Sequence, residues 1–160
     1  MLLEVKNLRK WFEVRKRLFG KKLYVKAVDG VSFNLSRGEA LSIVGESGSG
    51  KTTLGKTILR LYEPTDGHIL FEGKDITKLK QKELKWYRKE TSLVQQDPFG
   101  AIPPHFTIYK VLKEPLVINR MAKDEEEARE MIFNALKDVN LPPEEFISKY
   151  PHMLSGGQLQ

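Results

Sequence analysis

The segment Gly45-Glu46-Ser47-Gly48-Ser49-Gly50-Lys51-Thr52-Thr53 decides how this chain folds. It follows an apolar run at 40–44 that predicts a short buried strand. It precedes Leu54, Ile58 and Leu61, whose spacing predicts one apolar face of a helix. Strand, glycine-rich loop and helix are the context of a phosphate-binding loop with the pattern G-x-x-x-x-G-K-[ST]. The alternative, a Gly/Ser-rich loop with a chance lysine, is disfavoured by these flanking elements.

Each residue type in the loop has a role in holding phosphate. Glycines let backbone N–H groups turn inward around phosphate oxygens, and the helix N-terminus adds positive partial charge. Lys51 supplies a point charge for the terminal phosphates, and the Thr52 hydroxyl is the expected ligand of Mg²⁺. The predicted contacts to a magnesium-bound nucleoside triphosphate are Gly45, Glu46, Ser47, Gly48, Ser49, Gly50, Lys51, Thr52 and Thr53.

The composition limits the kind of protein this is. A chain of 160 residues can bury a core, so one domain with a small subdomain is expected. It has no cysteine, which excludes a disulfide framework and a cysteine metal site. Its first residues do not read as a secretory signal, and no run approaches the roughly 18 apolar residues that cross a bilayer. Any membrane association is therefore expected to come through a partner.

The net charge of +6 raises nucleic acid as a possible partner. Basic residues gather at 15–22, in an expected hairpin loop around Gly20, and at 78–89, in an expected helix that also carries Glu83 and Trp86. Solvated faces explain both groups more simply than a nucleic-acid groove does. No nucleic-acid partner is expected.

The N-terminal part predicts an antiparallel sheet. Residues 3–8 and 31–35 alternate between apolar and polar, and residues 37–39 form a turn into the strand at 40–44. Trp11 and Phe12 lie between the two outer strands. An aromatic ring beside a phosphate site can stack an adenine, although core packing is the favoured role for either residue on local grounds.

A second strand of a parallel sheet is expected at 91–95, after a strand at 68–73 and a helix at 80–89. Prolines and a glycine at 97–104 forbid regular structure, so Gln96 lies where this strand becomes a loop. Ligands of such sheets bind beyond the carboxyl ends of the strands. Gln96 is therefore expected to face the nucleotide.

Residues 108–150 predict a helical subdomain. Asp124 marks a helix start, followed by the apolar stripe Ala128, Met131, Ile132, Ala135, Leu136 and Val139. The expected fold is thus an α/β P-loop NTPase with a mostly parallel central sheet, an N-terminal antiparallel β subdomain and a helical subdomain. We divide it into a nucleotide-binding core at 1–96 and a loop and helical subdomain at 97–160.

The sequence Leu-Ser-Gly-Gly-Gln at 154–158, about a hundred residues after the phosphate loop, is where the chain resembles a known family. Ser155 can cap a helix, while Gly156 and Gly157 allow close backbone approach, so the turn can donate N–H groups to a phosphate. A Ser-Gly-Gly turn without a ligand is the alternative. The pair of motifs and their spacing resemble the ATP-binding subunits of ABC transporters.

The resemblance implies further roles. Ser155, Gly156, Gly157 and Gln158 would contact ATP held by the other subunit of a head-to-tail dimer. Phe12 falls where the family keeps its adenine-stacking aromatic residue, with Trp11 as the neighbouring candidate. Gln96 matches the family's Q-loop glutamine, which contacts Mg²⁺ and the attacking water and relays contacts with the membrane subunits.

Residues 96–99 and 150–152 look most like the branch that imports oligopeptides, dipeptides or nickel. Gln95, Met153 and Leu159 depart from the usual pattern, which weakens the substrate assignment more than the nucleotide site. The implied partners are membrane-spanning subunits, a second ATP-binding subunit and, indirectly, a solute-binding protein. The implied location is cytoplasmic, peripheral on the inner face of the membrane.

The family continues beyond these motifs with a magnesium-holding aspartate, a catalytic glutamate and a histidine, which the 160 residues do not contain. The chain is therefore expected to be an incomplete ABC domain that binds ATP but hydrolyses it poorly. The strand at 40–44 is expected to lack a neighbour on one side. Residues 155–160 are expected to be poorly ordered or held by another chain.

Two other functions stay open. An ABC-type ATPase acting on DNA or the ribosome would ask for a coiled-coil insertion or a tandem cassette, and neither is visible. A non-catalytic nucleotide-binding fragment is the other possibility.

Overall fold

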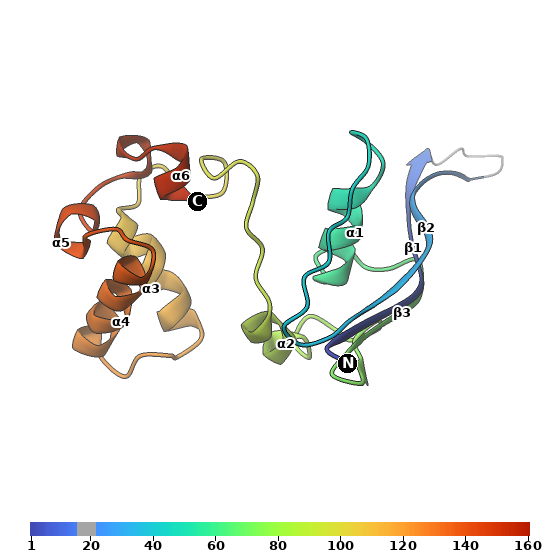
Figure 1. Ribbon diagram of the computed structural model, residues 1–160, viewed down its shortest axis with the longest axis horizontal. Coiled ribbons are helices and arrows are strands. Elements are labelled where there is room, and N and C mark those ends of the chain that lie inside the picture. Colours follow the sequence, from blue (N-terminus) through green and yellow to red (C-terminus); the bar gives the residue numbers. More distant parts are fainter. Residues whose placement is uncertain (16–21) are drawn as a thin grey trace. The chain divides into compact units, whose positions relative to one another are not determined.

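The computed structural model describes residues 1–15 and 22–160, except for the side chain of Arg15. The expected hairpin loop around Gly20 and most of its basic residues lie at 16–21, outside the described residues. The chain divides into two compact units, Met1–Ser92 and Leu93–Gln160 (Figure 1). Each unit has its own hydrophobic core.

The first unit is built on a four-stranded antiparallel sheet in the order β2-β1-β3-β4. Its strands are β1 (Leu3–Arg15), β2 (Leu23–Leu35), β3 (Asp66–Phe71) and β4 (Lys74–Asp75). Leu3 of β1 lies opposite Leu35 on one side and opposite Phe71 on the other. The alternating pattern at 3–8 and 31–35 therefore predicted this sheet correctly.

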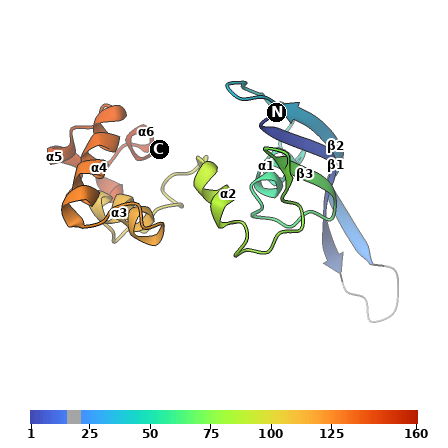
Figure 2. The ribbon, with the colours of Figure 1, turned by 90° about the horizontal axis from the view of Figure 1, so that it is seen from below.

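Two helices complete the first core. Helix α1 (Lys51–Ile58) lies against the sheet, as Figures 1 and 2 show, and Leu54 is its most buried apolar side chain. Helix α2 (Lys85–Glu90) begins later than the predicted start at 80, because residues 81–84 form turns. It contributes Tyr87, which is 1% exposed and packs edge to face on Phe71.

Helix α1 ends one turn before the predicted apolar residue Leu61, which is 53% exposed. Arg60 adopts a left-handed backbone with φ 56°, which stops the helix. Its side chain is buried, and its Nε and Nη2 groups donate to the carbonyls of Ile76 and Leu79, each at 3.0 Å. Arg60 thus joins the end of α1 to the segment after β4.

The predicted parallel sheet is not formed. Residues 40–44 and 91–95 are not strands, and the one sheet among the described residues is antiparallel. A strand needs a neighbour to accept and donate its ladder hydrogen bonds, and neither segment has one within the described part of the chain. Val44 is 92% exposed and Val94 68% exposed. The expected strand at 40–44 with one unpaired edge is therefore not formed, and a mostly parallel core is wrong for these residues.

The second unit is helical, as predicted. It contains α3 (Ile108–Ile118), α4 (Glu125–Asp138), α5 (Pro143–Phe146), the 3₁₀ helix η1 (Pro151–Met153) and α6 (Gly156–Leu159). The Asp124 carboxylate caps α4 by accepting from the Glu127 N–H at 2.8 Å. Ile132 and Leu136 of the predicted stripe are buried against α3 and α5, whereas Val139 lies past the helix end and is exposed.

Raising the pH above 10 is expected to destabilise the first unit through Tyr87. Its hydroxyl donates to the Ile58 carbonyl at 2.9 Å, and burial raises the pKa of Tyr87 to about 12. Because this pKa exceeds that of the unfolded chain, the stabilisation is present below pH 10 and is lost as pH rises towards 12. At pH 11 the loss is about 1 kcal/mol.

Urea titrations at pH 8 and pH 11 check this prediction. The wild type should lose about 1 kcal/mol more unfolding free energy between the two pH values than Tyr87→Phe loses. An equal loss in both proteins would show that ionisation of Tyr87 is not linked to folding.

Candidate functional site

The phosphate loop leads directly into α1. Gly50 is the N-cap residue of the helix, with φ 96°, and Lys51 is the first helical residue. Inside the loop the Ser49 N–H donates to the Glu46 carbonyl at 3.2 Å, which closes a turn. The N–H groups of a first helical turn have no partner within the helix, so they are available to an anion.

Lys51 lies inside the curve of this loop. Its ammonium donates to the carbonyls of Gly45 and Glu46, each at 2.6 Å, and to the Ser49 hydroxyl at 3.3 Å. The positive charge is therefore held by neutral oxygens at the mouth of the helix. Phosphate oxygens can replace those carbonyls with stronger, charge-assisted hydrogen bonds.

Strand β2 forms one wall of the loop. A Cβ atom at Gly50 would lie 2.1 Å from the Ala27 carbonyl oxygen, so only glycine fits there. Beside this contact lies a hollow of about 470 Å³. Its lining includes Lys26, Ala27, Val28 and Asp29 of β2, Gly45, Ser49 and Gly50 of the loop, and Lys51 and Leu54 of α1.

The strand pairing brings both candidate aromatic residues near the loop. Trp11 lies opposite Lys26 and Phe12 opposite Val25, one and two residues along β2 from Ala27. Two residues of a strand span about 7 Å, so Val25, the partner of Phe12, lies about that far from Ala27 along β2. The predicted adenine platform and the loop therefore belong to the same unit, and stacking of an adenine on Phe12 stays a prediction.

The two aromatic residues have different surroundings. Trp11 donates from Nε1 to Asp29 at 3.2 Å, and the Lys26 ammonium lies 4.5 Å from its ring centre. Phe12 meets the Tyr62 ring edge to face, with ring centres 5.5 Å apart. The Trp11 edge is thus held by a hydrogen bond, whereas the Phe12 ring contacts the Tyr62 ring and the Lys10 ammonium.

In the second unit the turn at 155–160 is well formed, so the expectation that it is poorly ordered or held by another chain is wrong. The Ser155 hydroxyl accepts from the Gln158 N–H at 3.3 Å, and the Gln158 side chain accepts from the Ser155 N–H at 3.0 Å. This capping box starts α6 despite its four residues. Leu159 then packs on the apolar core of the unit.

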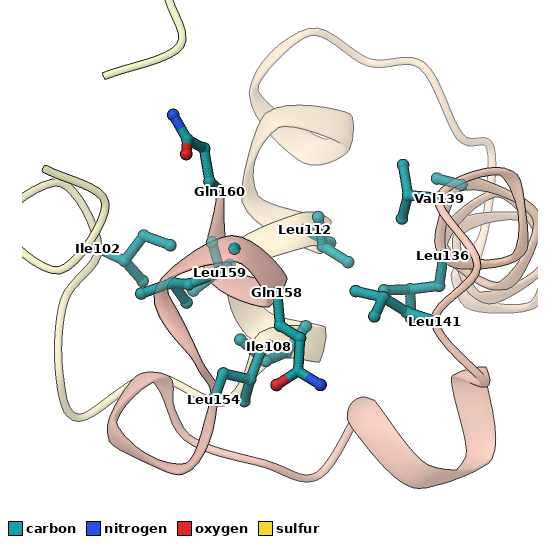
Figure 3. A pocket seen from close by; sticks show the side chains of 13 residues that line it. Ile102, Ile108, Leu112, Leu136, Val139, Leu141, Leu154, Gln158, Leu159 and Gln160 are labelled. Carbon is teal, nitrogen blue, oxygen red and sulfur yellow. The ribbon is translucent and has the colours of Figure 1, made fainter. Parts of the chain in front are cut away.

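The turn also contacts the segment around Gln96. The Gln160 side chain donates to the Gln95 carbonyl at 3.3 Å, and the Phe99 ring lies 3.8 Å from where a Cβ of Gly156 would be. Figure 3 shows Leu159 of α6 near Ile102, among the side chains that line a pocket of about 360 Å³. The second unit therefore brings the Q-loop segment and the Ser-Gly-Gly turn together.

The two proposed ligands of Mg²⁺ lie in different units. Thr52 is exposed in the first turn of α1, and Gln96 is exposed in the second unit. A threonine hydroxyl is an oxygen ligand of the kind that Mg²⁺ prefers, so Thr52 fits the ion. The joint action of Thr52 and Gln96 stays a prediction.

Within 1–15 and 22–160, no group of three or more His, Cys, Asp or Glu side chains is placed to hold a metal ion. None of the described helices has the length and apolar character that spanning a membrane requires.

Sequence reasoning missed two neighbours of the site. Ala27 supports Gly50, and Tyr62 contacts Phe12, although these partners are 23 and 50 residues apart in the chain. No periodicity or spacing connects such pairs, because only the packing of α1 on the sheet brings them together.

Comparisons with known proteins agree with this geometry. The family profile described as ABC transporter matches residues 28–160. The oligopeptide transport ATP-binding protein AppF of Bacillus subtilis is 47% identical, over 99% of this chain and 48% of its own length. The dipeptide transport ATP-binding protein DppF of Escherichia coli is 40% identical, over 99% of this chain and 47% of its own length. This chain thus spans about half the length of the curated relatives it matches.

Solved structures show the same likeness. A dimeric, post-hydrolysis structure of the ATP-binding cassette MJ0796 bound to ADP and Pi matches with a TM-score of 0.83 at 30% identity, over 99% of this chain and 65% of that one. The cbiO1 protein of Clostridium perfringens matches with a TM-score of 0.74 at 30% identity, over 99% of this chain and 57% of that one. The profile covers most of the chain, including the phosphate loop and the Ser155 turn, and the chain therefore belongs to the ABC transporter family.

Proposed function

We propose that this chain is the ATP-binding part of the motor subunit of an ABC importer. The observation that carries the proposal is the Lys51 ammonium enclosed by the 45–50 loop at the N-terminus of α1. Helix dipole, backbone N–H groups and a lysine charge converge at this point, as binding of a nucleoside triphosphate requires. The proposed contacts are Gly45, Glu46, Ser47, Gly48, Ser49, Gly50, Lys51, Thr52 and Thr53, with Phe12 stacking the adenine.

The second unit is proposed to act on nucleotide held by another copy or a related subunit. Ser155, Gly156, Gly157 and Gln158 would donate to its phosphates, and the dimeric structure of the similar cassette MJ0796 supports such pairing. Gln96 would position water beside Mg²⁺, whose charge neutralises the phosphates when it is bound. We retain the functional division into 1–96 and 97–160 as part of this proposal.

Peptides or a related solute are the proposed cargo. Support comes from the similar AppF and DppF proteins, which are oligopeptide and dipeptide transport ATP-binding proteins. The proposed partners are membrane-spanning subunits, a second ATP-binding subunit and, indirectly, a solute-binding protein. The protein would then work at the cytoplasmic face of the membrane.

We further propose that the 160-residue chain binds ATP but hydrolyses it poorly. Phosphoryl transfer depends on groups positioned around the γ-phosphate, and losing a catalytic base costs orders of magnitude in rate. Within the phosphate loop at 45–53, Glu46 is the one residue with a carboxylate. In this proposal the chain holds the nucleotide without a complete hydrolytic site.

Calorimetry with MgATP and a phosphate-release assay test both parts. Binding with turnover far below that of a complete ABC ATPase supports the proposal. Ordinary turnover would refute the second part, and no heat with MgATP would refute the first.

The net charge of +6 favours one other candidate, an ATPase acting on nucleic acid. Binding of duplex DNA that weakens steeply with salt would favour that reading instead.

A further inference from the structure

We infer that Tyr62 is a positioning residue for the base platform of the nucleotide site, an inference that rests on the proposed function. Tyr62 meets Phe12 with an interplanar angle of 88° and ring centres 5.5 Å apart. Aromatic pairs prefer this edge-to-face geometry, because the positive edge of one ring meets the negative face of the other. The contact restricts how the Phe12 ring can tilt.

Tyr62 is itself tied to the phosphate-loop helix. Its backbone N–H donates to the Lys56 carbonyl of α1 at 3.2 Å, and the Lys56 ammonium lies 5.9 Å from its ring centre. Helix α1 begins at Lys51, beside the loop that would hold the phosphates. Tyr62 therefore links the position of the base platform to the element that positions the phosphates.

Lys10 lies over the Phe12 ring as well. Its ammonium lies over the Phe12 ring, 4.9 Å from the ring centre, and 6.0 Å from that of Tyr62. With the two ring centres 5.5 Å apart, the directions from Phe12 to Lys10 and to Tyr62 differ by about 70°. Lys10 thus covers one face and Tyr62 lies towards the ring edge. Neither group takes the second face, which is the face a purine would use.

This arrangement predicts a split between base and phosphate recognition. Removing the Tyr62 ring lets Phe12 tilt, so the part of the affinity that depends on stacking should fall. Contacts to the phosphates come from the 45–53 loop and should be unaffected. An aromatic pair of this kind contributes enough to change an affinity by roughly two- to tenfold.

The test compares MgATP with magnesium tripolyphosphate, which has the phosphates without the base. Calorimetry on the 160-residue chain should show MgATP binding about two- to tenfold weaker in Tyr62→Ala, with tripolyphosphate binding unchanged. Tyr62→Phe keeps the ring and should match the wild type for both ligands. Tyr62→Leu, which keeps the bulk without the ring, should repeat the alanine result and replaces that variant if alanine impairs folding.

Tyr24→Ala is the matched control, because Tyr24 packs on Trp11 with ring centres 6.2 Å apart. It should leave both ligands unchanged. A selective loss for MgATP in Tyr24→Ala, but not in Tyr62→Ala, would make Trp11 the platform and overturn the inference. Equal losses for both ligands in Tyr62→Ala and Tyr62→Leu would reduce Tyr62 to a structural role and also overturn it.

The failure of the proposed function has a different signature in the same experiment. A wild-type chain that binds neither ligand refutes the nucleotide site itself. A wild-type chain that binds tripolyphosphate as tightly as MgATP refutes the stacking role of Phe12, and the role of Tyr62 with it. The inference alone is contradicted when the wild type binds MgATP more tightly than tripolyphosphate and this difference is unchanged in Tyr62→Ala and Tyr62→Leu.

Discussion

Replacing Lys51 with alanine is expected to weaken MgATP binding at least 100-fold. The ammonium is held at the mouth of α1 by the carbonyls of Gly45 and Glu46 and by the Ser49 hydroxyl. Hydrogen bonds to charged groups contribute about 1.5–3 kcal/mol each, and two of them to phosphate oxygens account for roughly this loss. Calorimetry at fixed ionic strength measures it.

The matched control is Lys89→Ala, which removes the same charge from an exposed position at the end of α2 in the same unit. It should change the affinity less than threefold, since an exposed charge at a distance is largely screened. If both variants lose affinity equally, the effect is one of net charge. If Lys51→Ala binds like the wild type, the 45–53 loop is not the nucleotide site.

Replacing Gly67 with alanine is expected to lower the unfolding free energy of the first unit by about 3 kcal/mol or more. Gly67 has φ 89°, and a Cβ there would lie 2.4 Å from the Asn7 carbonyl oxygen and 2.7 Å from the Leu8 Cα. Strands β1 and β3 would have to separate at this point. The separation would disturb Leu8 and Ile69, both of which are 0% exposed.

Gly73→Ala distinguishes close approach from backbone strain. Gly73 has a similar φ of 77°, but an added Cβ would meet no atom within 4 Å. This variant should lose only about 1 kcal/mol, the cost of a left-handed backbone. Urea unfolding of both variants, followed by circular dichroism, gives the difference. Equal losses of unfolding free energy in the two variants would mean that the close approach of β1 at Gly67 costs nothing beyond the left-handed backbone.

The elements that were predicted correctly depend on neighbours in the chain. The loop at 45–50 leads into a helix as predicted, because its residue types and spacing are typical of a loop before a helix N-terminus. Helix α4 was recognised because Asp124 caps it and its apolar residues recur at helical spacing. The alternation at 3–8 and 31–35 predicted paired strands for the same reason.

The failures have a common cause, which is that pairing and packing are not local. The apolar runs at 40–44 and 91–95 favour strands, but a strand exists only with a hydrogen-bonded neighbour. Helix length alone predicted that 155–160 would not hold together, yet the Ser155 cap and the burial of Leu159 stabilise it. The end of α1 follows from the burial of Arg60, whose carbonyl partners lie after β4.

The sequence by itself determined that this chain has a glycine-rich loop with a lysine ahead of a helix, and a helical second half, because adjacent residues specify each of them. Only the tertiary structure decided what surrounds the loop. The Ala27 carbonyl against Gly50, the two aromatic residues placed beside them by strand pairing, and the Tyr62 contact with Phe12 all join residues far apart in the chain. Such contacts arise when α1 packs on the sheet, and no local pattern encodes them.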